Sequence, residues 1–217
     1  MIEEITANIY LISGSEYSSN SYLLKGKKRA LIDPGLKNNE PNLKESLQQA
    51  GLSPEDIDLV LLTHGHIDHF SAAGVFKQAE LLMSQADAEF VNQADTEATC
   101  ASYFPHGSAD FPPIKRYLEN NEIIDLEGFK LKVIFTPGHS QGSVCFLEEE
   151  KGLLFSGDTV FKGACGRTDL KTSNKKDLIE SLHKLDKLSF ETLCPGHGLI
   201  LKGHQKTNLV NCLSWLE

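Results

Sequence analysis

Short apolar runs and stretches of helical periodicity follow one another along this chain. Three of the runs have the length and the Leu-, Ile- and Val-rich composition of buried strands: 57–62, 129–135 and 153–156. Leu178, Leu182 and Leu185 recur at the spacing of one helix face, which predicts a helix over 175–188 with Asn174 as its N-cap. Strands in two runs, each followed by helices, suit two packed sheets with helices outside them.

The rest of the pattern predicts further elements of the same kinds. Strands are expected over 5–13, 21–24, 30–32, 79–84 and 143–147, and helices over 43–50, 71–79, 85–91 and 208–216. Asn42 is a suitable N-cap for the helix 43–50, and Gly51 is a suitable residue to end it. Several loops then lie at the carboxyl ends of strands, where enzymes built on a rigid sheet often carry their chemistry.

One such loop holds an unusual concentration of metal-binding side chains. It follows the apolar run 57–62 and contains His64, His66, Asp68 and His69. Neutral imidazole and carboxylate are ligands that zinc, iron and manganese accept. In extended backbone His64 and His66 project to the same side, whereas Asp68 and His69 come after the chain has turned. This loop can therefore supply ligands to two adjacent metal ions.

Three other positions strengthen this interpretation. His139 and His197 each end a Pro-Gly-His turn that follows an apolar segment, and glycine lets the backbone approach its neighbours closely there. The chain has eight His in all, and five of them lie in the loop and the two turns. Asp158 follows the apolar run 153–156 after one glycine and would be an ordinary turn residue by itself. Beside five His it becomes a candidate bridging ligand, because a carboxylate can span two cations.

The motif His64-x-His66-x-Asp68-His69, followed by His139, Asp158 and His197, resembles that of the metallo-β-lactamase superfamily. The resemblance covers about residues 5 to 200 and includes Asp33-Pro34-Gly35. It implies an α+β fold, a four-layer αβ/βα sandwich of two mixed sheets flanked by helices, with the metals at one edge. It assigns the ligands to two ions: His64, His66 and His139 to the first, Asp68, His69 and His197 to the second, and Asp158 to both. Asp33 would support a ligand, or serve as a turn residue, or both.

The cofactors implied are two divalent metal ions, with zinc expected and iron or manganese as alternatives. A bound dication lowers the pKa of water to about 7 and would supply hydroxide for attack on a bound carbonyl. Asp68 and Asp158 are then the catalytic candidates of the protein. A thiolate, whose free thiol has a pKa of about 8.5, leaves without an acid. The resemblance therefore favours a glyoxalase II-like hydrolase of thioesters.

Three other functions remain open at this point. A persulfide dioxygenase would use the same His motif with a single iron, and the segment Gly166-Arg167-Thr168-Asp169 keeps it in view. A lactonase or β-lactamase is disfavoured because many lactamases lack the third His of the cluster. A metal-stapled scaffold that only binds ligands is disfavoured because structural zinc sites are usually closed and rich in Cys.

Segment 94–121 is the least regular part of the sequence. It is expected to cap the core or to form a lid whose side chains wall the substrate pocket: Tyr103, Phe104, His106 and Phe111. Arg167 could form a fork for a substrate carboxylate, although we favour a structural pair with Asp169 or Asp158. These residues complete the candidate pocket.

Length and charge bound the remaining expectations. The chain has 217 residues, a length that predicts one domain over 1–217. The net charge of −9 opposes nucleic acid and anionic membranes as partners, so a small-molecule substrate is expected, and the oligomeric state is left open. No signal peptide or spanning run of about 20 apolar residues is recognised, and the five scattered Cys suit a reducing cytoplasm. Only one short helix fits after His197, so the helical domain of dedicated glyoxalase II enzymes is not expected.

Overall fold

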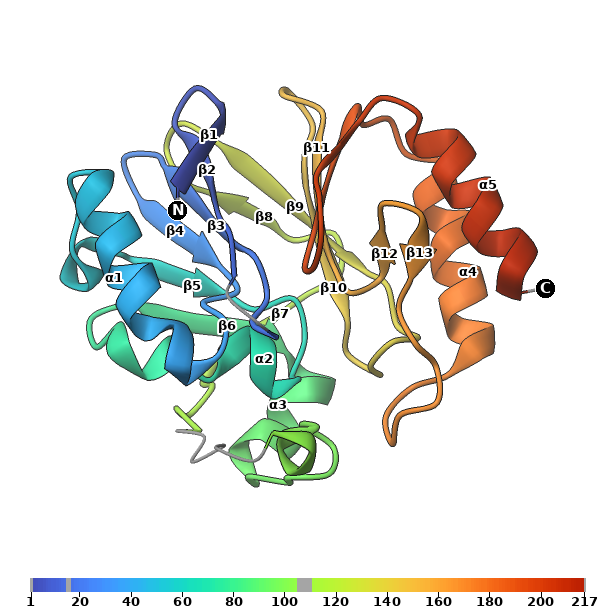
Figure 1. Cartoon of the computed structure of the whole chain (residues 1–217), viewed down its shortest axis with the longest axis horizontal. Helices are drawn as coiled ribbons and strands as arrows, with labels where there is room; N and C mark the ends of the chain where they lie inside the picture. The colour runs from blue at the N-terminus through green and yellow to red at the C-terminus, as the bar shows by residue number, and fades with distance from the viewer. Residues whose placement is uncertain (1, 15–16, 105–110, 217) are drawn as a thin grey trace.

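The computed structural model describes residues 2–14, 17–104 and 111–216. In these residues two mixed β-sheets pack face to face, and helices cover both outer faces (Figure 1). Helices α1 (Glu40–Gln49) and α3 (Gln85–Asn92) lie outside the first sheet, and α4 (Lys175–Asp186) and α5 (Gln205–Leu216) lie outside the second. The four-layer α+β sandwich predicted from the sequence is therefore confirmed.

The first sheet has its seven strands in sequence order, from β1 to β7. Its antiparallel half holds β1 (Ile2–Thr6), β2 (Ile9–Ile12), β3 (Ser21–Lys25) and β4 (Arg29–Ile32). The parallel half continues with β5 (Leu59–Leu61), β6 (Glu80–Ser84) and β7 (Arg116–Leu118). The carboxyl ends of these parallel strands meet at one edge, so the His-rich loop after β5 emerges there.

The second sheet has the order β15-β14-β11-β10-β9-β8. Its strands are β8 (Ile123–Asp125), β9 (Lys130–Phe135), β10 (Val144–Glu148), β11 (Leu153–Gly157), β14 (Thr192–Pro195) and β15 (Leu201–Lys202). Strands β9, β11 and β14 run in one direction, because β10 is antiparallel to both β9 and β11 and β14 is parallel to β11. Their carboxyl ends therefore share one edge. A small hairpin, β12 (Val160–Phe161) and β13 (Ala164–Cys165), follows β11.

Three apolar cores separate the four layers. The core between the sheets is centred on four fully buried residues: Leu24, Leu61, Phe146 and Phe155. Leu43 and Leu47 of α1 and Val91 of α3 pack on the outer face of the first sheet. The second sheet is covered by leucines of α4 and α5: Leu178, Leu182, Leu185, Leu209 and Leu213. The leucine stripe predicted for α4 thus faces the core, and Asn174 caps the helix by accepting hydrogen bonds from the amides of Lys176 and Asp177.

Several predicted boundaries are wrong for identifiable reasons. The predicted strand 5–13 is two strands, because Asn8, with a φ of 63°, turns the chain into a hairpin. Helix α1 starts at Glu40, since a 3₁₀ turn over Lys37–Asn39 leads into it and Pro41 is tolerated in its first turn. Asn42 is consequently inside the helix and not its N-cap.

The predicted helix 71–79 is also wrong. The chain instead forms the short helix α2 (Ile67–Phe70) within the motif, followed by a 3₁₀ turn over Ala73–Val75. Other 3₁₀ turns span Pro54–Asp56 and Ala101–Tyr103. None of the helices in the described part of the chain has the length and apolar character needed to cross a membrane.

Candidate metal centre

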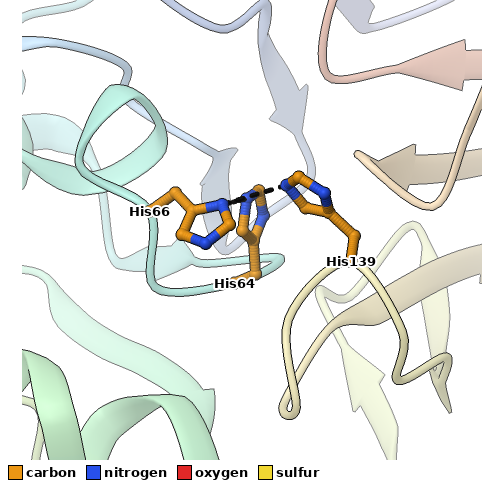
Figure 2. A group of neighbouring side chains, drawn as sticks. All are labelled: His64, His66 and His139. Carbon is orange, nitrogen blue, oxygen red and sulfur yellow. Dashed lines mark hydrogen bonds between the residues drawn. The ribbon is translucent and has the colours of Figure 1, made fainter. Parts of the chain in front are cut away.

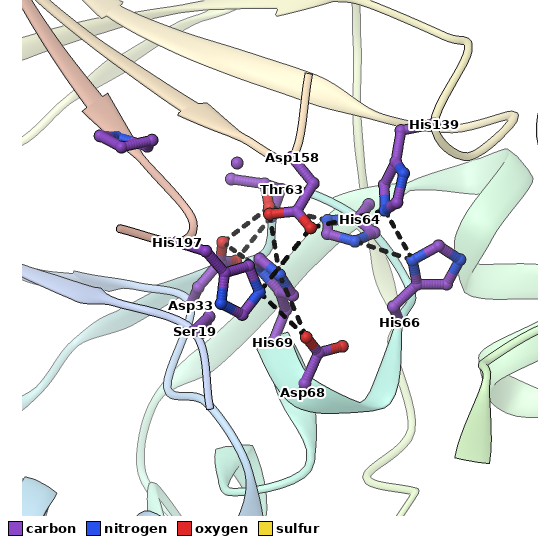
Figure 3. A network of polar contacts seen from close by, with 12 residues as sticks. Ser19, Asp33, Thr63, His64, His66, Asp68, His69, His139, Asp158 and His197 are labelled. Carbon is purple, nitrogen blue, oxygen red and sulfur yellow. Dashed lines mark hydrogen bonds and ion pairs between the residues drawn. The ribbon is translucent and has the colours of Figure 1, made fainter. Parts of the chain in front are cut away.

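The seven predicted ligands meet where the carboxyl ends of the two sheets face each other (Figure 3). Four of them come from the loop after β5 and from α2: His64, His66, Asp68 and His69. His139 follows β9, Asp158 follows β11 and His197 follows β14. The register pairs Gly157 of β11 with Pro195 of β14, which places the Asp158 and His197 turns next to each other.

His64, His66 and His139 form the first triad. Figure 2 shows their rings turned toward one another. The Nδ1 atom of His66 lies 3.1 Å from Nε2 of His64 and 2.9 Å from Nε2 of His139. All three side chains are buried.

Hydrogen bonds on the far side of two rings assign their tautomers. His139 donates from Nδ1 to the carbonyl oxygen of Arg167 at 3.0 Å. His64 donates from Nδ1 to the Thr63 hydroxyl at 3.1 Å, which itself donates to Asp33. Both Nε2 atoms therefore carry lone pairs that face the interior of the triad. A hydrogen bond from His66 can satisfy only one of these lone pairs, whereas a cation would satisfy both.

Asp68, His69 and His197 form the second triad. His197 Nε2 is 3.0 Å from the Asp68 Oδ2 atom, and His69 Nε2 is 3.8 Å from the same oxygen. His69 is fully buried, while His197 is about one-third exposed. A side chain on Gly196 would collide with the Asp158 carboxylate and the His69 ring. Glycine at this position lets the His197 turn approach both residues.

The Asp158 carboxylate lies between the two triads. Its Oδ2 atom is 3.6 Å from Nε2 of His139 and 3.7 Å from Nε2 of His197, and its Oδ1 atom is 3.2 Å from Nε2 of His69. One carboxylate thus faces donors of both triads.

These donors fit divalent metal ions. A tetrahedral site with metal–nitrogen bonds of about 2.0–2.1 Å separates its nitrogens by roughly 3.3 Å, close to the spacings of the first triad. Three donor groups fall within the spacing of a metal site: His64, His66 and His139; His64, His69 and Asp158; Asp68, His69 and His197. Among the described residues, the buried ligand atoms without a hydrogen bond of good geometry are His66 Nε2, His69 Nε2 and Asp158 Oδ1, the last two facing each other at 3.2 Å. A bound cation would satisfy such atoms.

Asp33 holds the second triad from behind. Its carboxylate accepts hydrogen bonds from the Thr63 amide at 2.8 Å, the Thr63 hydroxyl at 2.6 Å and His69 Nδ1 at 2.8 Å. The bond to His69 directs Nε2 of that ring toward Asp158. Asp33 also has a φ of 48°, as a turn residue would. Both sequence-based readings of Asp33 are therefore compatible with its position.

The two triads differ in electrostatics. Burial, reinforced by His139, lowers the pKa of His66 to about 3, and burial likewise lowers the pKa values of His64 and His139. Burial opposes protonation of His69 as well, but Asp158 and Asp33 outweigh it and raise the pKa of His69 well above its ordinary value. The first triad is neutral near pH 7, whereas the second tends to hold protons.

The two carboxylates of the site, Asp68 and Asp158, have lowered pKa values. Burial favours their neutral forms, but His69 and His197 outweigh it and hold the pKa values of Asp68 and Asp158 below the ordinary range. For His197, Asp158 and the hydrogen bond to Asp68 outweigh burial and raise the pKa. Both acids are therefore ionised at neutral pH, each beside an imidazole that readily takes a proton.

This difference in imidazole pKa predicts that, as the pH falls, a metal bound by the second triad is released before a metal bound by the first. A raised imidazole pKa means that the proton persists to higher pH, so a cation entering the second triad must displace protons from His69 and His197. Each displaced proton weakens binding by up to about tenfold per pH unit. The pKa values of the first triad are lowered instead, so fewer protons compete with a cation there. We expect zinc affinity of the second triad to fall much more than that of the first between about pH 8 and pH 6, in chelator competition. Parallel weakening of both metals would contradict this.

The residues predicted to wall the pocket differ in their surroundings. Tyr103 is 69% exposed, while Phe104 and Phe111 are partly buried against the first core, and the Phe111 ring packs on Phe70 with centroids 5.6 Å apart. His106 lies outside the described residues. Two of the four aromatic candidates thus have a packing role.

Arg167 contributes to the site through its backbone. Its guanidinium forms two hydrogen bonds with the Asp169 carboxylate, at 2.7 and 2.8 Å, and is mostly exposed. The pair with Asp158 that the sequence left open is not among the ion pairs of the described residues. The carbonyl oxygen of Arg167, which no sequence motif marks, is the group that orients His139.

Sequence reasoning missed three residues that hold the ligand loops. Thr63 connects Asp33 to His64, as described above. Asp87 of α3 accepts a hydrogen bond from the Gly142 amide in the loop after His139, and Asn20 before β3 donates one to the Pro195 carbonyl of the His197 turn. Asp87 looks like an ordinary acidic residue in the first turn of a helix, and Asn20 like a loop residue. Only their burial reveals them.

Comparison with known proteins agrees with the geometry of the site. The family model of the metallo-beta-lactamase superfamily matches residues 14–197, which include all seven ligand candidates. The chain belongs to the metallo-beta-lactamase superfamily. It is 36% identical over 200 residues to a probable metallo-hydrolase of Methanocaldococcus jannaschii, covering 88% of this chain and 93% of that protein. The resemblance inferred from the motif is therefore confirmed.

Further members of the superfamily are similar in sequence or in structure. Hydroxyacylglutathione hydrolase GloC of Haemophilus influenzae is 32% identical over 198 residues, covering 88% of this chain and 91% of that enzyme. A metallo-beta-lactamase family protein from Thermus thermophilus has the same fold, with a TM-score of 0.83 over 98% of this chain and 80% of its own, at 24% identity. A protein crystallised in a di-iron-bound form is 33% identical, with a TM-score of 0.71 over 85% of this chain and 89% of its own. The family and the two relatives named as hydrolases support a metal-dependent hydrolase.

Proposed function

We propose that this superfamily member is a two-metal hydrolase that cleaves thioesters of small-molecule substrates. The observation that carries the proposal is the position of Asp158. Its carboxylate faces Nε2 of His139 in the first triad and Nε2 of His69 and His197 in the second. A single-ion site would need only one of these triads.

Two similarities support the proposal. The GloC relative is named for hydrolysis of hydroxyacylglutathione, which is a thioester. The relative crystallised with two iron ions is 33% identical to this chain. Zinc is the metal we propose, because imidazole and carboxylate donors suit it, and iron is the alternative.

The ions and the protein would contribute different parts of the catalysis. Bound divalent ions lower the pKa of water to about 7 and polarise a carbonyl oxygen. The protein fixes the donors: the Arg167 carbonyl orients His139, Asp33 orients His69, and Thr63 orients His64. Asp68 and Asp158 bring the negative charge that offsets two dications. Burial raises the pKa of the nearby Cys100 to about 11, so this thiol is protonated at neutral pH and is a poor nucleophile.

The state of the two acids favours thioesters over amides. An amide nitrogen must be protonated as it leaves, and Asp68 and Asp158 are poor proton donors because their pKa values are lowered. A thiolate leaves without that proton, since the pKa of its free thiol is about 8.5. The ionised acids therefore match a leaving group that needs no acid.

Metal analysis together with thioester hydrolysis tests the proposal. The protein is stripped, reloaded anaerobically with zinc or iron, and assayed with S-lactoylglutathione, with a β-lactam, and with glutathione persulfide while oxygen is recorded. About two zinc ions per chain and zinc-dependent thioester cleavage are expected. One iron per chain with oxygen uptake on the persulfide would establish the dioxygenase instead, and preferential cleavage of the β-lactam would establish a lactamase.

Selectivity for the thiol part of the substrate is expected to be weak. The net charge of −9 gives no long-range attraction for an anionic glutathione ester. Tyr103 is largely exposed, and Arg167, a cation close to the ligands, is engaged by Asp169. We expect S-lactoylglutathione and a lactoyl thioester of a small neutral thiol to differ by less than about 100-fold in kcat/KM, or about 2.7 kcal/mol. A larger preference would show a glutathione-binding surface.

A further inference from the structure

Asp87 is a buried carboxylate that contacts both loops of the first triad. Its Oδ2 atom accepts hydrogen bonds from the Gly65 amide at 2.8 Å and from the Ser140 hydroxyl at 2.6 Å. Its Oδ1 atom accepts one from the Gly142 amide at 2.7 Å. Gly65 stands between His64 and His66, and Ser140 follows His139. One side chain therefore connects the backbone segments that carry all three imidazoles of that triad.

The helix that carries Asp87 presses directly on both loops. A Cβ atom on Gly65 would lie 2.5 Å from the Phe90 ring, and one on Gly142 would lie 2.6 Å from Asp87 Oδ1. At the end of β6, the Ser84 hydroxyl donates to the Gly142 carbonyl at 2.6 Å. These contacts leave no space for the loops to shift toward α3, so the position of α3 sets the separation of the two loops.

The burial of the Asp87 carboxylate is destabilising and must be offset by its contacts. Asp87 is fully buried, and burial raises its pKa to about 6 even though three donors lower it. A buried carboxylate is strongly destabilising unless it is hydrogen-bonded, and none of the three donors to Asp87 is cationic. The three donors come from the two ligand loops alone, so packing of α3 on the sheet does not require this acid.

The His197 turn has a separate anchor. The Asn20 amide group donates to the carbonyls of Pro195 at 3.1 Å and Gly198 at 3.0 Å, and the Asn20 backbone amide donates to Gly196 at 2.7 Å. Asn20 lies just before β3 in the first sheet. The Tyr22 hydroxyl of β3 also donates to the Pro195 carbonyl at 2.7 Å. Asp87 of α3 thus holds the loop after His139, whereas Asn20 and Tyr22 hold the His197 turn, and the two anchors are distinct.

We propose that Asp87 is the positioning residue of the first triad: by joining Gly65 to Ser140 and Gly142 it sets the spacing between His64, His66 and His139. It does not contact the second triad, whose His197 turn is held by Asn20. The inference deepens the proposed two-metal function and rests on it. Its consequence is selective, because a change at Asp87 should affect one ion and a change at Asn20 the other.

Two isosteric substitutions test this selectivity. Asp87→Asn keeps the shape but turns an amide donor toward the donors of the loops, and Asn20→Asp turns an acceptor toward two carbonyls. Zinc affinities of both ions are measured by chelator competition on the full chain, and Co²⁺ absorption spectra identify each site by reference to His66→Ala and His197→Ala. Asp87→Asn should weaken the first ion by about 10- to 100-fold and alter its Co²⁺ spectrum, with the second ion unchanged. Asn20→Asp should do the reverse.

Matched variants separate positioning from folding. Glu89→Gln removes an exposed carboxylate from the same helix and should leave both affinities unchanged. Ser140→Ala removes one of the three donors and should weaken the first ion to a smaller extent, which keeps the test open if Asp87→Asn does not fold. Thermal unfolding of the metal-free variants shows whether each remains folded.

Several results would overturn the inference. Equal weakening of both ions by Asp87→Asn would make the residue a general stabiliser, and an unchanged first ion would remove its role. The failure of the two-metal function is recognised separately: wild-type protein would then bind one ion per chain. In that event weakening of this single ion by Asp87→Asn but not by Glu89→Gln would still support the positioning role.

Discussion

Asp158→Asn is expected to release one of the two metal ions and to lower kcat/KM for thioester hydrolysis by about 100-fold or more. The substitution keeps the shape of the side chain but removes the charge that faces His69, His139 and His197. Loss of residues that merely support metal ligands already costs about 10- to 100-fold, and Asp158 contacts donors of both triads directly. Metal content and steady-state kinetics of the same preparation would measure both effects.

The exposed acid Asp125 provides the control, because Asp125→Asn makes the same chemical change far from the site. It should bind two ions and keep wild-type kinetics. If Asp158→Asn also did so, Asp158 would be only the turn residue at the end of β11, and the two-metal proposal would lose its main support.

Asp33→Ala should give the largest loss of stability. It leaves three buried donors without an acceptor: the Thr63 amide, the Thr63 hydroxyl and Nδ1 of His69. Unsatisfied buried donors cost about 1–3 kcal/mol each, so we expect the free energy of unfolding of the metal-free protein to fall by about 3 kcal/mol or more. Urea unfolding measures this loss. The second ion should also bind more weakly, because the His69 ring is no longer oriented.

Asp33→Asn separates hydrogen bonding from backbone strain. Asn accepts the left-handed backbone conformation that Asp33 adopts, at a φ of 48°, more readily than Ala does. Its amide keeps one acceptor oxygen, so Asp33→Asn should retain part of the stability. Equal stability of wild type and Asp33→Ala would show that these hydrogen bonds contribute nothing to folding.

The ligands were predictable because their chemistry is local. His64, His66, Asp68 and His69 lie within one loop, and both Pro-Gly-His turns follow apolar runs that read as strands. The four-layer fold followed from the resemblance, since strand and helix patterns alone fit other two-sheet arrangements. The leucine stripe and the Asn174 cap of α4 are likewise local signals, and both are present.

What the sequence could not show depends on contacts between distant segments. Asp87 and Gly142 are 55 residues apart, and Asn20 and Pro195 are 175 apart. No periodic pattern connects such positions. The position of α2 was missed for a different reason: a helix of four residues is too short to produce a 3.6-residue repeat. Its start at Ile67 depends on the extended backbone of His66 before it.

Each triad takes its ligands from both sheets. A bound ion would therefore be a reversible cross-link between distant segments of the chain. His66 and His139 are 73 residues apart, and Asp68 and His197 are 129 apart. An ion on either triad closes a loop of that length, and loop closure restricts the unfolded chain as a disulfide would. Chelators should therefore loosen the contact between the sheets as well as abolish hydrolysis. Metal binding would thus contribute to holding the two sheets together as well as to catalysis.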